Sequence, residues 1–368
     1  FMQLICDKQL LVDAVANVSR AVSSKNTLAA LEGVLLRAKN NTLSLTGYDL
    51  ELAISTEIEA DVREAGEIVL SARIFLDMIR RMPSEQISIS SDAKMLTLVK
   101  GSMTEYTILG LPASEYPELP GVSETTELSI PQAALKNMIS QTLFAIAVSD
   151  SKPVHTGSLF DIKGGELCLV SVDGYRLALR REKVAFDETL SFIVPGKSLS
   201  EVSKLLRDEE GDVELGVARR HIIFRTGSYR IVSRLLEGEF LDYRAAIPEG
   251  GATTVKIGTR DLISAIDRAS LLISDNIKSP LRMKFEEGLI KISCSTAIGK
   301  AYDEIRCEQS GDDVEIGFNS RYMLDALKAS EGDEIRVLIN GPLSPIKLMP
   351  VEGDAFVFLV LPVRLKSE

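Results

Sequence analysis

The sequence predicts an α+β protein built from three similar domains, each with two helices and several antiparallel strands. The chain repeats itself with a step of 124 residues, as the matched bases Arg73, Lys197 and Arg321 illustrate. Each repeat carries two helical patterns, and the remainder alternates apolar and polar residues as strands do. A chain of 368 residues, 45% of them hydrophobic, is long enough for two or three cores at roughly 100 to 200 residues per domain. A step of this size indicates whole repeated domains rather than a solenoid.

Each repeat opens with a short strand and an amphipathic helix, expected at 9–22, 131–144 and 259–272. The first helix places apolar residues at helical spacing on one face: Leu10, Leu11, Ala14, Val15 and Val18. The other two helices match it with Leu135, Met138 and Ile139, and with Leu262, Ile263 and Ile266.

A second helix follows about 60 residues into each repeat, over 71–77, 195–201 and 319–325. Each of these segments carries a base followed four residues later by an acid: Arg73 and Asp77, Lys197 and Glu201, Arg321 and Asp325. Ser71 and Asn319 are suited to cap the helices that follow them, and Pro195 is tolerated at a helix start.

The rest of each repeat reads as strands separated by turn residues, for example at 42–46 and 166–170. Asp49 and Asp173 follow these strands at the same place in successive repeats, whereas the third repeat has Ala297 there. Gly164-Gly165 between two strand patterns predicts a hairpin turn rather than a phosphate-binding loop.

The joints between repeats are also alike, because 111–120 and 239–248 both carry Tyr and Pro. We place the domains at 2–122, 123–250 and 251–368. Phe1 precedes Met2, and we expect Met2 to be the natural first residue.

The composition limits which metal sites and catalytic sites the chain can contain. Four scattered cysteines, Cys6, Cys168, Cys294 and Cys307, lack metal-binding spacing and are expected to be reduced thiols, as in a cytoplasm. With only two histidines, a His-based triad or multi-His metal site is not expected. No apolar run reaches the roughly 18 residues of a membrane span, and the start lacks a secretory pattern. We therefore expect a soluble protein without metal or cofactor.

The 53 acidic residues could supply a paired-carboxylate enzyme site. However, the chain has no Gly-rich phosphate loop, nucleophile elbow or dinucleotide fingerprint. We predict that it is not an enzyme. A net charge of −11 also argues against a general nucleic-acid binder, because affinity for phosphates comes from Lys and Arg. Any binding to DNA must therefore rely on a local basic surface or on topology.

Four segments in the right order, combined with the threefold repeat, resemble the bacterial DNA polymerase III beta subunit family, the sliding clamps. They lie at 42–51, 172–178, 240–244 and 361–365. The resemblance covers essentially the whole chain. It implies a head-to-tail homodimer whose six domains close a ring, with twelve helices lining the hole and sheets on the rim.

That family resemblance implies a processivity factor that encircles duplex DNA without sequence preference and tethers enzymes to it. The implied partners are the DNA polymerase III alpha subunit and other polymerases, the clamp loader, and mismatch-repair and other proteins with a clamp-binding motif. The implied location is the bacterial cytoplasm, at the nucleoid. The alternative is a peptide-binding scaffold that shares the cleft but forms no ring on DNA.

Under this reading, contacts with DNA need only be weak, and bases concentrate on the lining helices. The candidate DNA-facing residues are Lys25, Arg73, Lys136, Lys197, Arg260, Arg268 and Arg321. For Arg73, Lys197 and Arg321 the alternative is an exposed ion pair with the acid four residues later. A base at a helix N-terminus opposes the macrodipole, and base before acid is the weaker order.

The family also implies a hydrophobic cleft between the second and third domains that receives short peptides. The matching residues are His155, Val172, Gly174, Tyr175, Arg176, Leu177, Leu241, Ala245, Ala246, Leu343, Pro345, Val360, Leu361, Pro362, Val363 and Arg364. His155 replaces a common aliphatic residue, and Ala245 and Ala246 stand where bulkier or basic residues are frequent. For 359–363 the alternative is an ordinary buried strand.

At the dimer seam, the family pairs an edge strand of the first domain with one of the third. Tyr106 and Ile108 on one subunit, with Leu271 and Leu272 on the other, fit this seam. The alternative is that Leu271 and Leu272 only end the core face of a helix.

Overall fold

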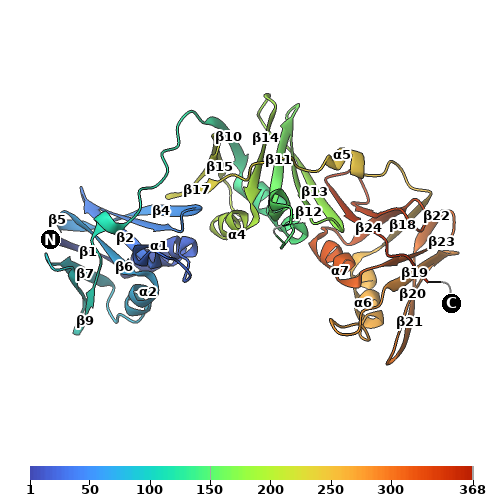
Figure 1. Ribbon diagram of the computed structural model, residues 1–368, viewed down its shortest axis with the longest axis horizontal. Helices are drawn as coiled ribbons and strands as arrows, with labels where there is room; N and C mark the ends of the chain where they lie inside the picture. Colours follow the sequence, from blue (N-terminus) through green and yellow to red (C-terminus); the bar gives the residue numbers. More distant parts are fainter. Residues whose placement is uncertain (150, 367–368) are drawn as a thin grey trace. The chain divides into compact units, whose positions relative to one another are not determined.

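The computed structural model describes residues 1–149 and 151–366, and Figure 1 labels its helices and strands. The chain forms two compact units. Unit 1 comprises Phe1–Ala133 and Ser200–Leu235, and unit 2 comprises Ala134–Leu199 and Leu236–Glu368. The middle repeat therefore contributes to both units. No helix in the described part of the chain is long and apolar enough to cross a membrane.

The elements of the three repeats follow a similar order, except that the middle repeat has one strand fewer among the described residues and ends with an additional short helix. The first repeat contains β1 (Met2–Asp7), α1 (Lys8–Val18), β2 (Gly33–Lys39), β3 (Thr42–Tyr48), β4 (Leu52–Glu59), β5 (Asp61–Glu64), β6 (Gly66–Ser71), α2 (Ala72–Arg80), β7 (Gln86–Ser91), β8 (Leu96–Gly101) and β9 (Thr104–Leu109). The middle repeat contains β10 (Thr126–Pro131), α3 (Gln132–Ser140), β11 (Gly157–Lys163), β12 (Glu166–Val172), β13 (Arg176–Lys183), β14 (Leu190–Pro195), α4 (Gly196–Leu205), β15 (Asp212–Val217), β16 (His221–Thr226), β17 (Tyr229–Arg234) and the short α5 (Tyr243–Ala246). The third repeat contains β18 (Thr253–Gly258), α6 (Thr259–Ala269), β19 (Leu281–Glu286), β20 (Leu289–Thr296), β21 (Gly299–Arg306), β22 (Glu308–Gly311), β23 (Val314–Phe318), α7 (Ser320–Ala329), β24 (Glu334–Ile339), β25 (Ile346–Met349) and β26 (Phe356–Val360).

The strands form two sheets in each unit, counted over the described residues. Unit 1 has an eight-stranded sheet, β10-β15-β16-β17-β4-β3-β2-β6, and a five-stranded sheet, β5-β1-β7-β8-β9. Unit 2 has a nine-stranded sheet, β14-β11-β12-β13-β26-β25-β24-β18-β22, and a four-stranded sheet, β21-β20-β19-β23. Every pairing within these sheets is antiparallel, as predicted for the α+β class.

One pairing rule joins consecutive repeats. The last strand of the middle repeat, β17, pairs with the fourth strand of the first repeat, β4, with Ser233 opposite Leu52. The last strand of the third repeat, β26, pairs in the same way with the fourth strand of the middle repeat, β13, with Val360 opposite Arg176. Leu52 and Arg176 are one 124-residue step apart. The junctions between repeats are therefore copies of each other.

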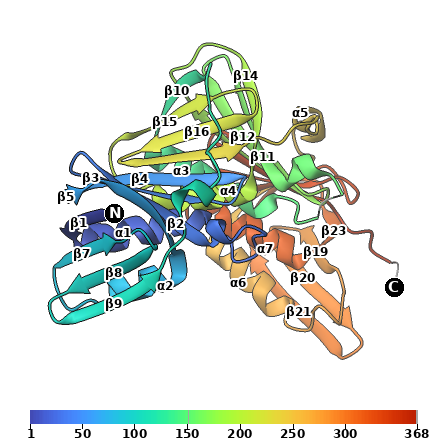
Figure 2. The same cartoon turned by 60° about the vertical axis from the view of Figure 1, so that its left-hand side comes forward.

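The same rule leaves one last strand and one fourth strand without a partner of the other kind among the described residues. β9 is the last strand of the first repeat and ends the five-stranded sheet, and β21 is the fourth strand of the third repeat and ends the four-stranded sheet. Figure 2 shows β7, β8 and β9 side by side, and likewise β19, β20 and β21.

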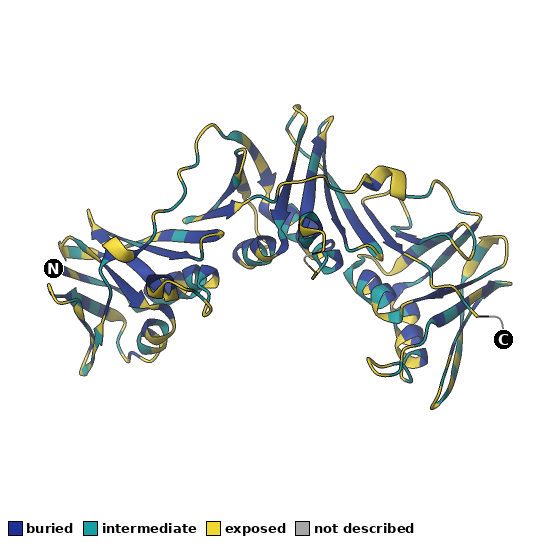
Figure 3. Cartoon of the chain, viewed as in Figure 1, coloured by how far each residue is buried: buried dark blue, intermediate teal, exposed yellow. Residues whose placement is uncertain are grey.

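The helices bury one face each. In α6, Leu262, Ala265, Ile266 and Ala269 are buried, and the helix packs on β20 and β21. Figure 3 shows the same division, with buried residues on one side of a helix and exposed residues on the other. Burial of such an apolar stripe is the main source of helix stability in a protein of this kind.

The predicted ends of the first helices are wrong, because α1, α3 and α6 stop at Val18, Ser140 and Ala269. After α1, the Ser19 hydroxyl donates to the Val15 carbonyl at 2.5 Å and the chain tightens into a 3₁₀ turn at Ser19–Ala21. After α3, the Thr142 hydroxyl donates to the Met138 carbonyl at 2.8 Å. Such local side-chain bonds compete with continuation of a helix.

Of the two residues predicted to cap helices with their side chains, Asn319 does so and Ser71 does not. Asn319 caps α7, since its Oδ1 accepts from the N–H groups of Arg321 at 3.0 Å and Tyr322 at 3.4 Å. Ser71 stands at the N-cap of α2 without a side-chain capping bond to any described residue. The Gly164-Gly165 turn is confirmed: both have positive φ, and Lys163 pairs with Glu166 across the hairpin.

The four cysteines are free thiols. Cys6, Cys168 and Cys294 are buried, and burial raises the pKa of Cys6 to about 12. These thiols are protonated at neutral pH and behave as small apolar side chains.

Gly47, in the segment at 42–51, occupies a position that has no room for a side chain. A Cβ at this position would lie 2.0 Å from the carbonyl oxygen of Val18 at the end of α1. We predict that Gly47→Ala lowers the free energy of unfolding by about 1–3 kcal/mol, because strand and helix must separate. The matched control is Gly121→Ala, where nothing lies within 4 Å of the added Cβ. Denaturant unfolding of both variants checks this, and equal midpoints would refute the close approach.

Candidate functional site

The turn after β12 directs two of the predicted cleft residues. Oδ1 of Asp173 accepts hydrogen bonds from the N–H groups of Tyr175 at 2.9 Å and Arg176 at 3.0 Å. Gly174, which follows Asp173, has a φ of +88°. The first repeat makes the same turn: Oδ1 of Asp49 accepts from Glu51 at 3.0 Å and Leu52 at 2.7 Å. The repeated aspartate is thus a turn former. The third repeat has Ala297 at this position, so it lacks the aspartate hydrogen bonds of this turn.

Arg176 is held by two carboxylates and two aromatic rings. Its Nε lies 3.0 Å from Oδ2 of Asp173, and its Nη1 lies 2.6 Å from Oδ2 of Asp325 on α7. The guanidinium sits 4.5 Å from the centroid of Tyr322 and 5.6 Å from that of Phe144. The side chain is only 12% exposed. Paired in this way, Arg176 is a fixed part of the surface rather than a mobile cation.

The C-terminal segment lies beside this cluster. After β26, the Leu361 N–H donates to the Tyr175 carbonyl at 2.9 Å, and the Val363 N–H donates to the Gly317 carbonyl at 2.7 Å. Leu361, Val363 and Tyr175 are exposed, and Tyr175 stacks on Tyr322 at 6.0 Å. The segment at 359–363 is therefore only partly an ordinary buried strand: Leu359 and Val360 are buried, and Leu361 onward runs along the surface.

An apolar cluster underlies the same region. Val172 and Leu177 are buried in it together with Leu159, Leu179 and Tyr243, and Phe240 packs against it. Leu241, Ala245 and Ala246 are exposed on the segment around α5, and Leu343 and Pro345 lie in the loop before β25. The predicted cleft residues thus divide into a buried floor and an exposed apolar rim.

His155 differs from the aliphatic residue expected of this position. Its ring is 8% exposed and meets Phe240 edge-on at 5.1 Å. Burial, and then the charge of Lys152, lower the pKa of His155, so the imidazole is neutral at pH 7. Its Nε2 is buried without a hydrogen-bond partner among the described residues.

Several residues that shape this region were not predicted. Asp325 was considered only as an alternative partner of Arg321, but it binds Arg176. Tyr322, Phe144 and Phe240 supply rings that their sequence positions did not single out. Lys347 is buried, and its Nζ donates to the Pro248 carbonyl at 2.6 Å on the segment that precedes the third repeat. The recurring Asp173 was the one signal that could have identified the turn.

The predicted DNA-facing bases lie mostly at exposed positions. Arg73, Lys197, Arg260, Arg268 and Arg321 are exposed on helices, Lys25 is exposed in the loop after Ser19–Ala21, and Lys136 is half-buried on α3. Arg268 pairs with Asp303 at 2.7 Å.

The alternative ion pairs, base with acid four residues later, are not made in two repeats. Asp77 pairs with Arg81 at 3.2 Å, and Asp325 pairs with Arg176. In the middle repeat, Glu201 contacts Lys204 at 3.1 Å and Arg20 at 3.7 Å. The acids of the second helices therefore bind other bases.

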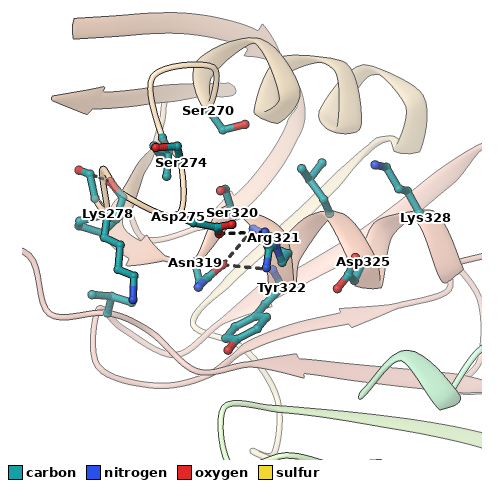
Figure 4. A pocket seen from close by; sticks show the side chains of 15 residues that line it. Ser270, Ser274, Asp275, Lys278, Asn319, Ser320, Arg321, Tyr322, Asp325 and Lys328 are labelled. Atoms are coloured by element: carbon teal, nitrogen blue, oxygen red, sulfur yellow. Dashed lines mark hydrogen bonds and ion pairs between the residues drawn. The ribbon is translucent and has the colours of Figure 1, made fainter. Parts of the chain in front are cut away.

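A hollow of about 860 Å³ lies at the start of α7. Figure 4 shows Arg321 in this hollow beside the capping Asn319 and Asp275. Nη2 of Arg321 lies 3.3 Å from Oδ1 of Asp275. Arg321 and Asp275 are both highly exposed. Such a pair is readily exchanged for solvent or another anion.

The predicted seam residues lie at β9 and β21. Tyr106 and Ile108 are on β9, where half-buried and exposed residues alternate. Leu271 and Leu272 follow α6, which packs on β21, and Leu271 is 81% exposed. Leu271 is therefore not part of a helix core face. Leu272 packs against the core of the third repeat.

The site has the features of a binding surface. Over residues 1–149 and 151–366, no group of three or more His, Cys, Asp or Glu side chains could hold a metal ion. The chemistry that is present consists of apolar contact, a fixed guanidinium and exposed bases.

Comparison with known proteins identifies the family. Three family models match in succession: the N-terminal, central and C-terminal domains of the DNA polymerase III beta subunit, over residues 2–120, 129–242 and 244–364. The beta sliding clamp of Bacillus subtilis is 35% identical over 99% of this chain and 100% of that protein. The clamp of Staphylococcus epidermidis is 33% identical over 99% of each.

Solved structures agree in fold. The sliding clamp of Bacillus subtilis matches with a TM-score of 0.96 and 33% identity, covering 99% of this chain and 100% of that one. The beta subunit of Pseudomonas aeruginosa matches with a TM-score of 0.94 and 30% identity, with the same coverage. The three-domain clamp fold is confirmed. The chain belongs to the DNA polymerase III beta subunit family, the beta sliding clamps, which are non-catalytic processivity factors of that polymerase.

Proposed function

We propose that two copies of this chain close head to tail into a ring around duplex DNA, and that each copy tethers polymerases through the cleft beside Arg176. The observation that carries this proposal is the pairing rule between repeats. Within the chain, a last strand always pairs with the fourth strand of the repeat before it. A second copy would extend that rule to the open edges of β9 and β21.

The rule also specifies a register for the seam. Leu52 and Arg176 lie opposite Ser233 and Val360 at the two existing junctions. One 124-residue step beyond Arg176 lies Lys300 of β21. In the same register, Lys300 would lie opposite Ile108 of β9 in the second copy, and Tyr302 would then lie opposite Tyr106. Leu271 and Leu272 would then cover the same joint from α6. A contact of this kind is heterologous, and it closes when two copies supply six repeats.

The charge distribution supports a ring that holds DNA by topology. The net charge of −11 opposes tight binding along the whole surface, because each neutralised phosphate requires a cation. Bases on helices that line the hole would contact phosphates weakly and without reading sequence. The exposed Arg73, Lys197, Arg260, Arg268 and Arg321, with Lys25 and Lys136, are the proposed contacts. Domain limits near residues 122 and 250 are part of this proposal.

The cleft supports peptide binding. Exposed Leu361, Val363 and Tyr175 border a buried apolar floor, and Arg176 is fixed nearby. An apolar anchor of a bound peptide would be desolvated there, while its backbone meets fixed polar groups. The proposed partners are the alpha subunit of DNA polymerase III and other polymerases, the clamp loader and mismatch-repair proteins. The proposed location is the bacterial cytoplasm, at the nucleoid.

The seam register predicts a specific cross-link. Thr107 and Ala301 lie between the aligned pairs, so Thr107→Cys/Ala301→Cys should form a covalent dimer on mild oxidation, because opposed strand residues lie at disulfide distance. Thr107→Cys/Asp303→Cys, two residues out of register, is the matched control. Non-reducing electrophoresis distinguishes them. Equal cross-linking of both variants, or a monomeric wild type at micromolar concentration, would refute the seam.

The cleft predicts a selective loss of partner binding. Leu361→Ser should weaken stimulation of DNA polymerase III by about tenfold, since an anchor contact contributes on the order of 1–2 kcal/mol. Leu96→Ser is the matched control, because Leu96 and Leu361 are equally exposed at 42%. Primer-extension assays report stimulation, and sedimentation checks that the dimer persists. Unchanged stimulation by Leu361→Ser would remove the cleft assignment.

A further inference from the structure

A second groove lies on the four-stranded sheet of unit 2. Arg282, Ser293 and Tyr302 are directly opposite one another across β19, β20 and β21 and so share one face. The next residue of β20, Cys294, points the other way, where its thiol donates to the Ala269 carbonyl of α6 at 3.1 Å. The groove is therefore on the face away from α6, and it encloses about 900 Å³.

The charge of this groove is opposite to that of the chain. Its described lining includes five bases, Lys278, Arg282, Lys300, Arg364 and Lys366, and no Asp or Glu. The whole chain has 42 bases and 53 acids. We call these five residues and their surroundings the basic groove.

Most of this charge is uncompensated. Arg282 pairs with Glu315 and also donates to the Lys366 carbonyl at 3.3 Å. The other four bases make no ion pair with any described residue. Cations gathered in a concave surface raise the local concentration of anions. The basic groove therefore favours an anionic ligand.

The rest of the lining combines neutral polar and apolar residues. The apolar part includes Ile277, Pro280, Val363 and Leu365. The chain at 363–365 forms one wall and lies close on the sheet, since a Cβ at Gly317 would be 2.6 Å from Leu365 Cδ2. A ligand with both acidic and apolar side chains would satisfy this surface.

A single-stranded nucleic acid fits less well. Such ligands bind through aromatic platforms on which successive bases stack. Tyr302 is the one aromatic residue in the described lining, and its hydroxyl donates to Glu304 at 2.7 Å. The balance of apolar and basic groups favours a peptide.

We propose that the basic groove binds an acidic segment, with interspersed apolar residues, of a partner protein. Val363 and Arg364 line this groove and are also predicted cleft residues, so the two surfaces are continuous along the chain. A partner anchored in the cleft could extend its acidic segment into the groove. Lys278 and Lys366 line the groove but are not predicted cleft residues, so replacing them tests the groove without changing a cleft residue.

The test uses the full chain and a labelled short peptide that alternates Glu with Leu. Lys278→Glu/Lys366→Glu should weaken binding at low salt by about tenfold, because two attractions become repulsions. Lys163→Glu/Lys183→Glu is the matched control, with the same charge change at two exposed lysines of the same unit. It should stay within about twofold of wild type. Fluorescence anisotropy measures both.

Further arms test the chemistry of the ligand. The same peptide with Gln for every Glu should bind weakly to all variants. In a Leu361→Ser background, Lys278→Glu/Lys366→Glu should weaken binding of the Glu peptide by the same factor as in the wild type, which separates the groove from the cleft. If the charge-reversed variant fails to fold, Lys278→Gln/Lys366→Gln should still weaken binding by about threefold.

Three results would overturn the proposal. One is equal affinity of the groove variant and its control for the Glu peptide. Another is equal binding of the Gln and Glu peptides. The third is tighter binding of an oligothymidylate that is lost in the groove variant, which would assign the groove to nucleic acid.

Discussion

Antiparallel pairing between the last strand of one repeat and the fourth strand of the repeat before it joins the three repeats and positions the candidate cleft. It merges strands of neighbouring repeats into the eight-stranded and nine-stranded sheets. An edge strand exposes unpaired backbone groups and is a liability unless it is covered or paired. Inside the chain the rule pairs four strands that would otherwise be edges, namely β4, β17, β13 and β26. At β9 and β21 it leaves two complementary ones, and a second copy is the proposed partner that pairs them.

The same junction positions the candidate cleft. Pairing of β26 with β13 sets Val360 opposite Arg176, and the next residues continue past Tyr175 and Gly317. Asp173 forms the turn that directs Arg176, and Asp325 on α7 fixes its guanidinium. A floor from the middle repeat and a rim from the C-terminal segment thus become one surface because a strand junction holds them together. Asp325 binds Arg176, whereas Arg321 at the exposed start of α7 contacts Asp275.

Much of this architecture could be predicted from the sequence, because a step of 124 residues aligns helices, turns and motifs at once. The Gly164-Gly165 hairpin and the Asn319 cap follow from local patterns and are confirmed. The predicted face of the first helix is confirmed except at Leu10, which is exposed. The helix ends are wrong, since Ser19 and Thr142 bond back to the preceding turn. The pairing of Arg176 with Asp325 was missed because Asp325 is 149 residues away in sequence, and short-range pairing rules suggest only Arg321 as an alternative partner. The basic groove could not be seen either, because its bases come from four separate segments that only the sheet brings together.

We propose that this acidic chain holds DNA by enclosing it, because its net charge of −11 opposes tight binding to phosphates. The direct measurement is retention of the loaded protein on circular DNA and on the same DNA after linearisation, at a salt concentration that weakens phosphate contacts. A closed ring predicts long retention on the circle and rapid loss from the free ends of the linear form. Equal retention on both forms would contradict the account, because it would mean that surface contacts rather than topology hold the DNA.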